Sequence, residues 1–225
     1  LGAFVGQVTE DYVDYVAALN ARCSRGVTPK NNASMLLWQA IGPAEISKES
    51  RKEFFKRLGV ATLPEKGDYY ISFRRFISDS ELSGQVSNEQ WMNQYEMAQK
   101  RPWSRQEFPK LAEWLAANEE PLALVVEATK RSKRYDPLTA KSDQAILEVV
   151  VLRSGMNLEF FRALLIRAML RIGNGQLDEA WYDLLACHRF GRLTGQGPTV
   201  VEALFGLAMD RDACNGCQML LQHAD

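Results

Sequence analysis

Apolar residues recur at intervals of three and four along most of the chain, which is the spacing of one face of an α-helix. The clearest run extends from Leu158 to Ile172. Glycine, proline and asparagine interrupt these runs at short intervals, and short joints favour antiparallel neighbouring helices. The pattern therefore predicts about ten helices, no convincing strand pair and an all-α fold built from helical hairpins, as an irregular bundle or a solenoid.

Local start and stop signals place many of the helices. Ser87 and Ser104 each open a capping box, and Gly59 suits the C′ position of a helix that Ser47 caps. Pro109 makes a helix start one turn after Ser104 an open alternative. Asn118 is expected to cap a helix that begins with two acids and a proline.

Other ranges are less regular. A helix from Tyr12 to Cys23 is expected at the start, and a helix from Ser142 is expected to end at Ser154-Gly155. Residues 60–86 contain β-formers at Tyr69–Phe73 without a second strand to pair with. An extended loop followed by a short helix at Arg74–Ile77 is the resulting prediction.

One hairpin, from Phe161 to Phe190, resembles a tetratricopeptide repeat. Small residues stand at the matching spacings, namely Ala168, Gly175, Ala180 and Cys187, with Leu184 at the large apolar position. The resemblance implies a peptide-binding role. Any pair of closely packed helices needs small residues, so a generic helical hairpin accounts for the same pattern.

The chain as a whole is similar to an uncharacterised family of bacterial proteins of the kind abundant in planctomycetes. The resembling stretches are Asn31–Ala40, Asn118–Leu122 and Ala180–Arg189. The resemblance implies no transferable activity. It implies an N-terminal membrane-anchoring segment, which fits the apolar stretch Leu1–Val5, and hence an exported or envelope-anchored protein; the alternative is a cytoplasmic one.

Composition narrows the classes of function. The chain has 225 residues, 46% of them apolar, and 27 basic against 28 acidic side chains. Such a balance gives no overall attraction to nucleic acid, and none is expected as a partner. A single domain over residues 1–225 is expected, with 1–86 and 87–225 as its sub-units if it divides. Because the chain starts at Leu1 and the helical pattern still runs at Gln222, we expect a fragment of a longer protein.

The sharpest chemical candidate is the pair Cys214 and Cys217, which suggests a zinc site, thiol redox chemistry or a disulfide. His188 is the histidine that would complete a metal set with them. Cys187 and His188 cannot act together within one helix, because adjacent residues point about 100° apart. Small residues in helix packing explain the two cysteines equally well.

A basic cluster, Lys130, Arg131, Lys133 and Arg134, is the strongest local concentration of charge. It could bind phosphate or an acidic partner, or be a solvated loop. Trp103 is the tryptophan expected at the surface, and the cluster and Trp103 together form the candidate binding residues. The remaining tryptophans are expected in the core: Trp38, Trp91, Trp114 and Trp181.

The hypothesis that follows is a non-enzymatic helical binding or scaffold domain whose partner is a protein or peptide, with no cofactor and no predicted catalytic residue. The alternative is a metal- or thiol-dependent enzyme that uses the region of Cys214 and Cys217.

Overall fold

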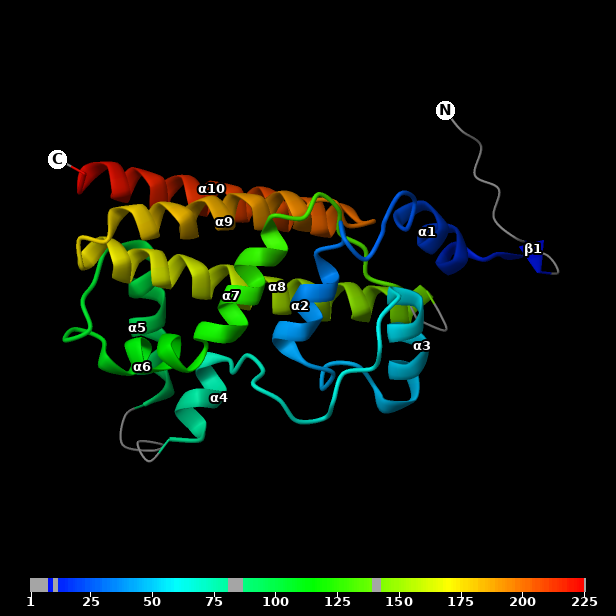
Figure 1. Ribbon diagram of the computed structural model, residues 1–225, viewed down its shortest axis with the longest axis horizontal. Helices are drawn as coiled ribbons and strands as arrows, with labels where there is room; N and C mark the ends of the chain where they lie inside the picture. Colours follow the sequence, from blue (N-terminus) through cyan, green and yellow to red (C-terminus); the bar gives the residue numbers. More distant parts are fainter. Residues whose placement is uncertain (1–7, 10–11, 81–86, 139–142, 225) are drawn as a thin grey trace.

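The all-α fold is confirmed by the computed structural model, which describes residues 8–9, 12–80, 87–138 and 143–224 (Figure 1). Ten helices lie within these ranges. They are α1 (Tyr15–Cys23), α2 (Ser34–Ile41), α3 (Lys48–Leu58), α4 (Phe73–Ser78), α5 (Asn88–Lys100), α6 (Pro109–Ala117), α7 (Glu119–Thr129), α8 (Asp143–Gly173), α9 (Leu177–Thr194) and α10 (Val200–Gln222). A minimal antiparallel ladder also pairs β1 (Val8–Thr9) with β2 (Tyr12–Val13), although no strand pair was predicted.

Three long helices form the frame of the molecule. Helix α9 packs against both α8 and α10, and α10 also contacts α8. Figure 1 shows the three lying alongside one another, in yellow-green to red, with α3, α4 and α6 below them in this view. The turn between α8 and α9 is tight because Gly175 adopts a φ of 75°, a conformation that other residues rarely take. This hairpin has the predicted helical packing.

Some of the shorter helices pack on this frame, and others pack on one another. Helix α2 packs on α7, and α5 packs on α8. One core cluster joins side chains from Ala33 to Ala213, with Trp114 and Phe160 among its largest fully buried members. A second, smaller cluster lies around α3 and contains Trp38, Ile46, Phe54, Phe55 and Leu58.

Helix α8 contradicts the prediction of a break at Ser154-Gly155. It runs without interruption for 31 residues. Gly155 is exposed, and Ser154 and Asn157 are buried on the opposite side. A glycine within a helix costs about 1 kcal/mol relative to alanine, which the packing of the buried residues after it, such as Phe160 and Phe161, can offset. Ser142, the predicted start, lies outside the described residues.

Four helix starts test the predictions. The capping box at Ser87 is confirmed, whereas α6 begins at Pro109 and not at Ser104, so the alternative start one turn later is correct. Helix α1 begins at Tyr15, after the ladder that contains Tyr12. Asn118 does precede α7, but its side chain makes no capping hydrogen bond.

Trp181 was expected in the core, and that prediction is wrong. Its side chain is 45% exposed on α9, whereas Trp38, Trp91 and Trp114 are buried as predicted. The buried face of α9 is set by the smaller residues Ala180, Leu184 and Cys187, which leaves Trp181 beside it toward solvent.

Candidate functional site

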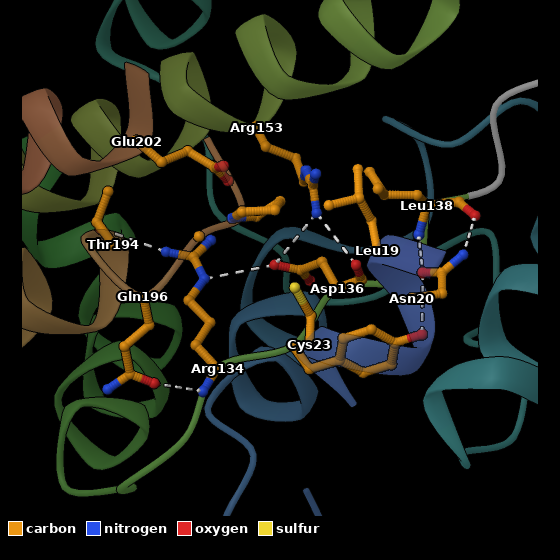
Figure 2. A pocket seen from close by; sticks show the side chains of 13 residues that line it. Leu19, Asn20, Cys23, Arg134, Asp136, Leu138, Arg153, Thr194, Gln196 and Glu202 are labelled. Atoms are coloured by element: carbon orange, nitrogen blue, oxygen red, sulfur yellow. Dashed lines mark hydrogen bonds and ion pairs between the residues drawn. The ribbon is translucent and has the colours of Figure 1, made fainter. Parts of the chain in front are cut away.

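The basic cluster does not form a common surface, because Arg134 points into the protein. Its side chain is only 10% exposed. One guanidinium nitrogen donates to Asn157 Oδ1 at 2.7 Å. Nε lies 3.4 Å from Asp136 Oδ2, an interaction drawn in Figure 2. These contacts take Arg134 out of the proposed binding cluster.

The other three residues of the cluster separate. Lys130 forms an ion pair with Glu127 at 2.7 Å, and Arg131 donates to the main-chain oxygen of Lys30. Lys133 is exposed, and its main chain is hydrogen-bonded to the segment Asn31–Ala33. The loop is therefore fixed by its backbone against the start of α2, with three cations spaced around it.

Asp136 is the centre of a buried polar junction. Figure 2 shows its carboxylate between Arg134 and Arg153, and Trp38 Nε1 donates to Asp136 Oδ1 at 2.8 Å. Burial by itself raises the pKa of Asp136. The charges of Arg134 and Arg153 and the Trp38 hydrogen bond outweigh it, so the pKa lies below its ordinary value.

The cavity at this junction is small. Its volume is about 20 Å³, which is room for one water molecule and excludes a cofactor or a peptide. Glu202 also lines it, so two carboxylates balance the two arginines. The junction is best described as a structural joint between the loop 130–138, α8 and α10.

Trp103 was expected at the surface and is in fact buried, with 2% of its area exposed. Its Nε1 donates to the main-chain oxygen of Ile166 at 3.2 Å. A Cβ added to Gly173 would lie 2.1 Å from the Trp103 main-chain oxygen, so this loop packs tightly on the end of α8. Trp103 cannot contact a partner in this position.

The metal candidates come together where α9 and α10 approach most closely. A Cβ added to Gly206 would lie 2.6 Å from the Gly191 main-chain oxygen, so two glycines allow the two backbones to touch. One turn away, His188 Nδ1 lies 2.7 Å from Asp210 Oδ1. His188 Nε2 lies 3.5 Å from Cys217 Sγ.

Cys214 completes this group. Its sulfur, a carboxylate oxygen of Asp210 and a ring nitrogen of His188 all lie within 4.8 Å of one another. Sequence reasoning found His188, Cys214 and Cys217 but missed Asp210. The signal was present: Asp210, Cys214 and Cys217 are separated by four and three residues, which places them on one face of a helix.

The largest described cavity lies elsewhere, along the loop before α4. It is an open groove of about 780 Å³, within the range of ligand-binding clefts. Its walls come from the end of α2, the segment 65–72 and the middle of α8, where Met156 and Glu159 line it. No residue of this groove was singled out from the sequence, because its walls come from segments far apart in the chain.

The wall formed by residues 69–71 is held at several points. Tyr70 N donates to Ala40 O at 2.8 Å, and Ile71 N donates to Asn118 Oδ1 at 2.8 Å. Trp114 Nε1 donates to Ile71 O at 2.7 Å. Asn118 thus stabilises the extended segment instead of capping α7, and the β-formers of the sequence become one wall of the groove.

Negative charge predominates in the groove. Its lining holds four carboxylates and two cations, namely Glu45, Glu65, Asp68 and Glu159 against Lys66 and Arg75. Glu65 is paired with Arg51. Within the described part of the chain, no hydrogen bond or ion pair engages the carboxylates of Glu45, Asp68 or Glu159. Burial raises the pKa of Glu159, against the opposing charges of Arg162 and Arg74.

No protein-family model, curated protein or solved structure matches this chain. The two resemblances stated from the sequence therefore stay predictions. Among the described residues, no helix has the length and apolar character needed to cross a membrane, and Leu1–Val5 lies outside them.

Proposed function

We propose that this chain is a helical binding domain whose groove takes a basic segment of a partner protein. The observation that carries the proposal is the groove of about 780 Å³ in which the carboxylates of Glu45, Asp68 and Glu159 form no hydrogen bond or ion pair with another described residue. A lysine or arginine side chain of a partner would form such pairs. Since the three carboxylates face a partly enclosed space, salt screens their attraction for a cation less than it would at a flat surface.

The shape and the lining favour a peptide segment. The groove is open, and its walls include Tyr69 and Tyr70, which offer rings to the apolar stem of a long cationic side chain. The wall at Tyr69 is built for close packing. A Cβ at Gly42 would lie 2.6 Å from the Tyr69 ring, and φ at Gly42 is 80°, so only glycine fits beneath that ring. A preformed wall lowers the entropic cost of binding.

Replacing Asp68 with asparagine and Glu159 with glutamine together is expected to weaken binding of a lysine- and arginine-bearing peptide about tenfold. The two changes remove charge and keep shape. Fluorescence anisotropy with labelled peptides of matched length measures the effect. Glu49→Gln, an exposed change on α3 away from the groove lining, is the control and should bind as the wild type does.

Equal binding of an acidic peptide of the same length, or full affinity in the double variant, would overturn the proposal. Binding should also fall as salt rises, because exposed charges contribute part of the attraction.

Binding of the basic peptide is expected to weaken with acid at a higher pH than an ordinary glutamate would give. The pKa of Glu159 is raised by burial, so this carboxylate loses its charge first as the pH falls. The charges of Arg162 and Arg74 oppose that shift without cancelling it. Affinity measured between about pH 7 and pH 4 should therefore decline earlier in the wild type than in Glu159→Gln.

A further inference from the structure

Four side chains with metal-binding atoms meet on one side of the α9–α10 hairpin, outside the groove. His188 comes from α9, and Asp210, Cys214 and Cys217 come from successive turns of α10. The cluster is partly open, since His188 and Cys217 are half-buried and Cys214 is exposed. We propose that His188, Cys214 and Cys217 bind one zinc ion at this position, with Asp210 as the residue that orients the histidine.

The separation of two donor atoms already fits zinc. In a tetrahedral site with Zn–S near 2.3 Å and Zn–N near 2.0–2.1 Å, the sulfur and nitrogen lie about 3.6 Å apart. Cys217 Sγ and His188 Nε2 lie 3.5 Å apart. An ion placed to contact both atoms therefore needs no movement of this pair.

Asp210 gives the histidine the correct orientation. With Nε2 on the metal, Nδ1 carries the proton and donates to Asp210 Oδ1, which is 2.7 Å away. Ligating histidines generally donate their second ring N–H to a carboxylate or a carbonyl in this manner, which fixes the tautomer and the ring plane. The pair therefore stands in the arrangement that a metal site uses.

Cys214 supplies the third donor. Its sulfur lies within 4.8 Å of the Asp210 and His188 donor atoms, and it is one helical turn from Cys217. Closing the remaining distance requires a change of side-chain rotamer at an exposed position. The fourth position then faces solvent, as it does in zinc sites that keep one place for water.

The donor set selects the ion. Two thiolates with one imidazole are soft and borderline ligands, which favour zinc over magnesium or calcium. Burial raises the pKa of the Cys217 thiol, and the neighbouring Cys214 and Asp210 raise it further by their negative charge. A bound divalent cation offsets the repulsion between these negative groups, and its binding releases the thiol protons.

The same three residues also have the arrangement of a catalytic triad, with Cys217 as the nucleophile, His188 as the base and Asp210 as the carboxylate that orients the base. A nucleophile needs one thiol, whereas here a second sulfur, that of Cys214, lies within 4.8 Å of the His188 and Asp210 donor atoms. The site also lies far along α10, away from the amide groups of a helix N-terminus. We therefore assign the cluster to a metal ion.

Zinc loading of the purified 225-residue chain tests the proposal. After incubation with Zn²⁺ and gel filtration, elemental analysis should give about one zinc per chain, and Cys214→Ser and Cys217→Ser should each lose most of it. Cys23→Ser is the matched control, because Cys23 lies on α1 and should leave the zinc content unchanged. Thermal unfolding followed by circular dichroism confirms that each variant is folded.

Cobalt substitution reports on the ligands themselves. Co²⁺ should produce thiolate charge-transfer absorption and the intense visible bands of a tetrahedral ion, both absent in Cys217→Ser. Asp210→Asn should keep the stoichiometry and weaken zinc binding by about 10–100-fold, as expected for a residue that acts through a ligand.

Fewer than about 0.1 zinc per chain in the folded wild type would overturn the proposal. So would equal zinc content in Cys214→Ser, Cys217→Ser and Cys23→Ser. Rapid alkylation of Cys217 at neutral pH in protein that takes up no metal would assign the cluster to a nucleophile instead.

Discussion

Replacing Asp136 with alanine is expected to lower the free energy of unfolding by about 3–5 kcal/mol. The carboxylate is 6% exposed, and it lies between two guanidinium groups that are themselves nearly buried. Without it, Arg134 and Arg153 face each other across a cavity that holds no more than one water molecule. The cost is large because two charges are then left in the interior with one carboxylate, that of Glu202, in place of two.

Urea unfolding at pH 7 measures this loss. Glu53→Ala is the control, because Glu53 also pairs with an arginine but does so in solvent, and the unfolding midpoint should not move. An Asp136→Ala variant as stable as the wild type would show that the junction does not support the fold.

The same junction predicts a dependence on acid. The pKa of Asp136 is below its ordinary value in the folded protein, so its stabilising effect is fully present above the unfolded pKa of about 3.9. The effect is lost as the pH falls through the lower, folded pKa. Asp136→Asn keeps the shape without the charge, and it should lose less stability than the wild type between about pH 5 and pH 3.

Gly206→Ala is expected to destabilise the protein by about 2–3 kcal/mol. The added methyl group would lie 2.6 Å from the Gly191 oxygen and 2.9 Å from the Gly195 nitrogen. Both are main-chain atoms of α9 or its end, so the contact is relieved only by separating the two helices. Separation also carries His188 away from α10, and zinc affinity should fall even where the variant stays folded.

Gly155→Ala is the matched comparison. A Cβ there meets nothing within 4 Å, so the change brings only the higher helix propensity of alanine and should stabilise by up to about 1 kcal/mol. Both variants replace a helical glycine with alanine, and thermal and urea unfolding measures their stability. Gly206→Ala reports the packing clash, whereas Gly155→Ala reports helix propensity alone. A loss at Gly155 equal to that at Gly206 would contradict the role given to the α9–α10 contact.

Local signals in the sequence predicted the helices well where the controlling atoms are neighbours in the chain. The Ser87–Gln90 capping box forms as predicted, and Gly59 ends α3 in the left-handed conformation. A capping box depends on residues only three positions apart. The tight turn at Gly175 is local in the same way. The predicted cap at Asn118 fails because a distant residue, Ile71, donates to its side chain.

Side-chain positions that depend on distant helices could not be predicted. Trp103 stands beside a proline in a short joint, which favoured exposure, yet Ile166 and Gly173 of α8 enclose it. Arg134 stands in a basic loop of the sequence, but its side chain points into the buried junction. It donates there to Asn157, which lies 23 residues further along the chain. In each case the deciding contact comes from α8.

The two candidate sites, the α9–α10 cluster and the groove, also differ in how far neighbouring residues in the sequence determine them. The α9–α10 cluster was partly predicted, since two of its cysteines share one helical face, and the hairpin then brings His188 opposite them. The groove was not predicted at all. Its walls join α2, the segment 65–72 and α8 by hydrogen bonds between residues as far apart as Tyr70 and Glu159.

The position of α8 also bears on the order in which the chain can fold. Helices α5 and α7 bury apolar faces against α8 or α9, which follow them in sequence, and α2 packs on α7. During synthesis from the N-terminus, these earlier helices leave the ribosome before the surfaces that cover them exist. Helices α8, α9 and α10 contact their immediate neighbours in the chain and so form rapidly once made. We therefore expect chains truncated before α8 to aggregate during synthesis, whereas the 225-residue chain folds once α8, α9 and α10 have been made.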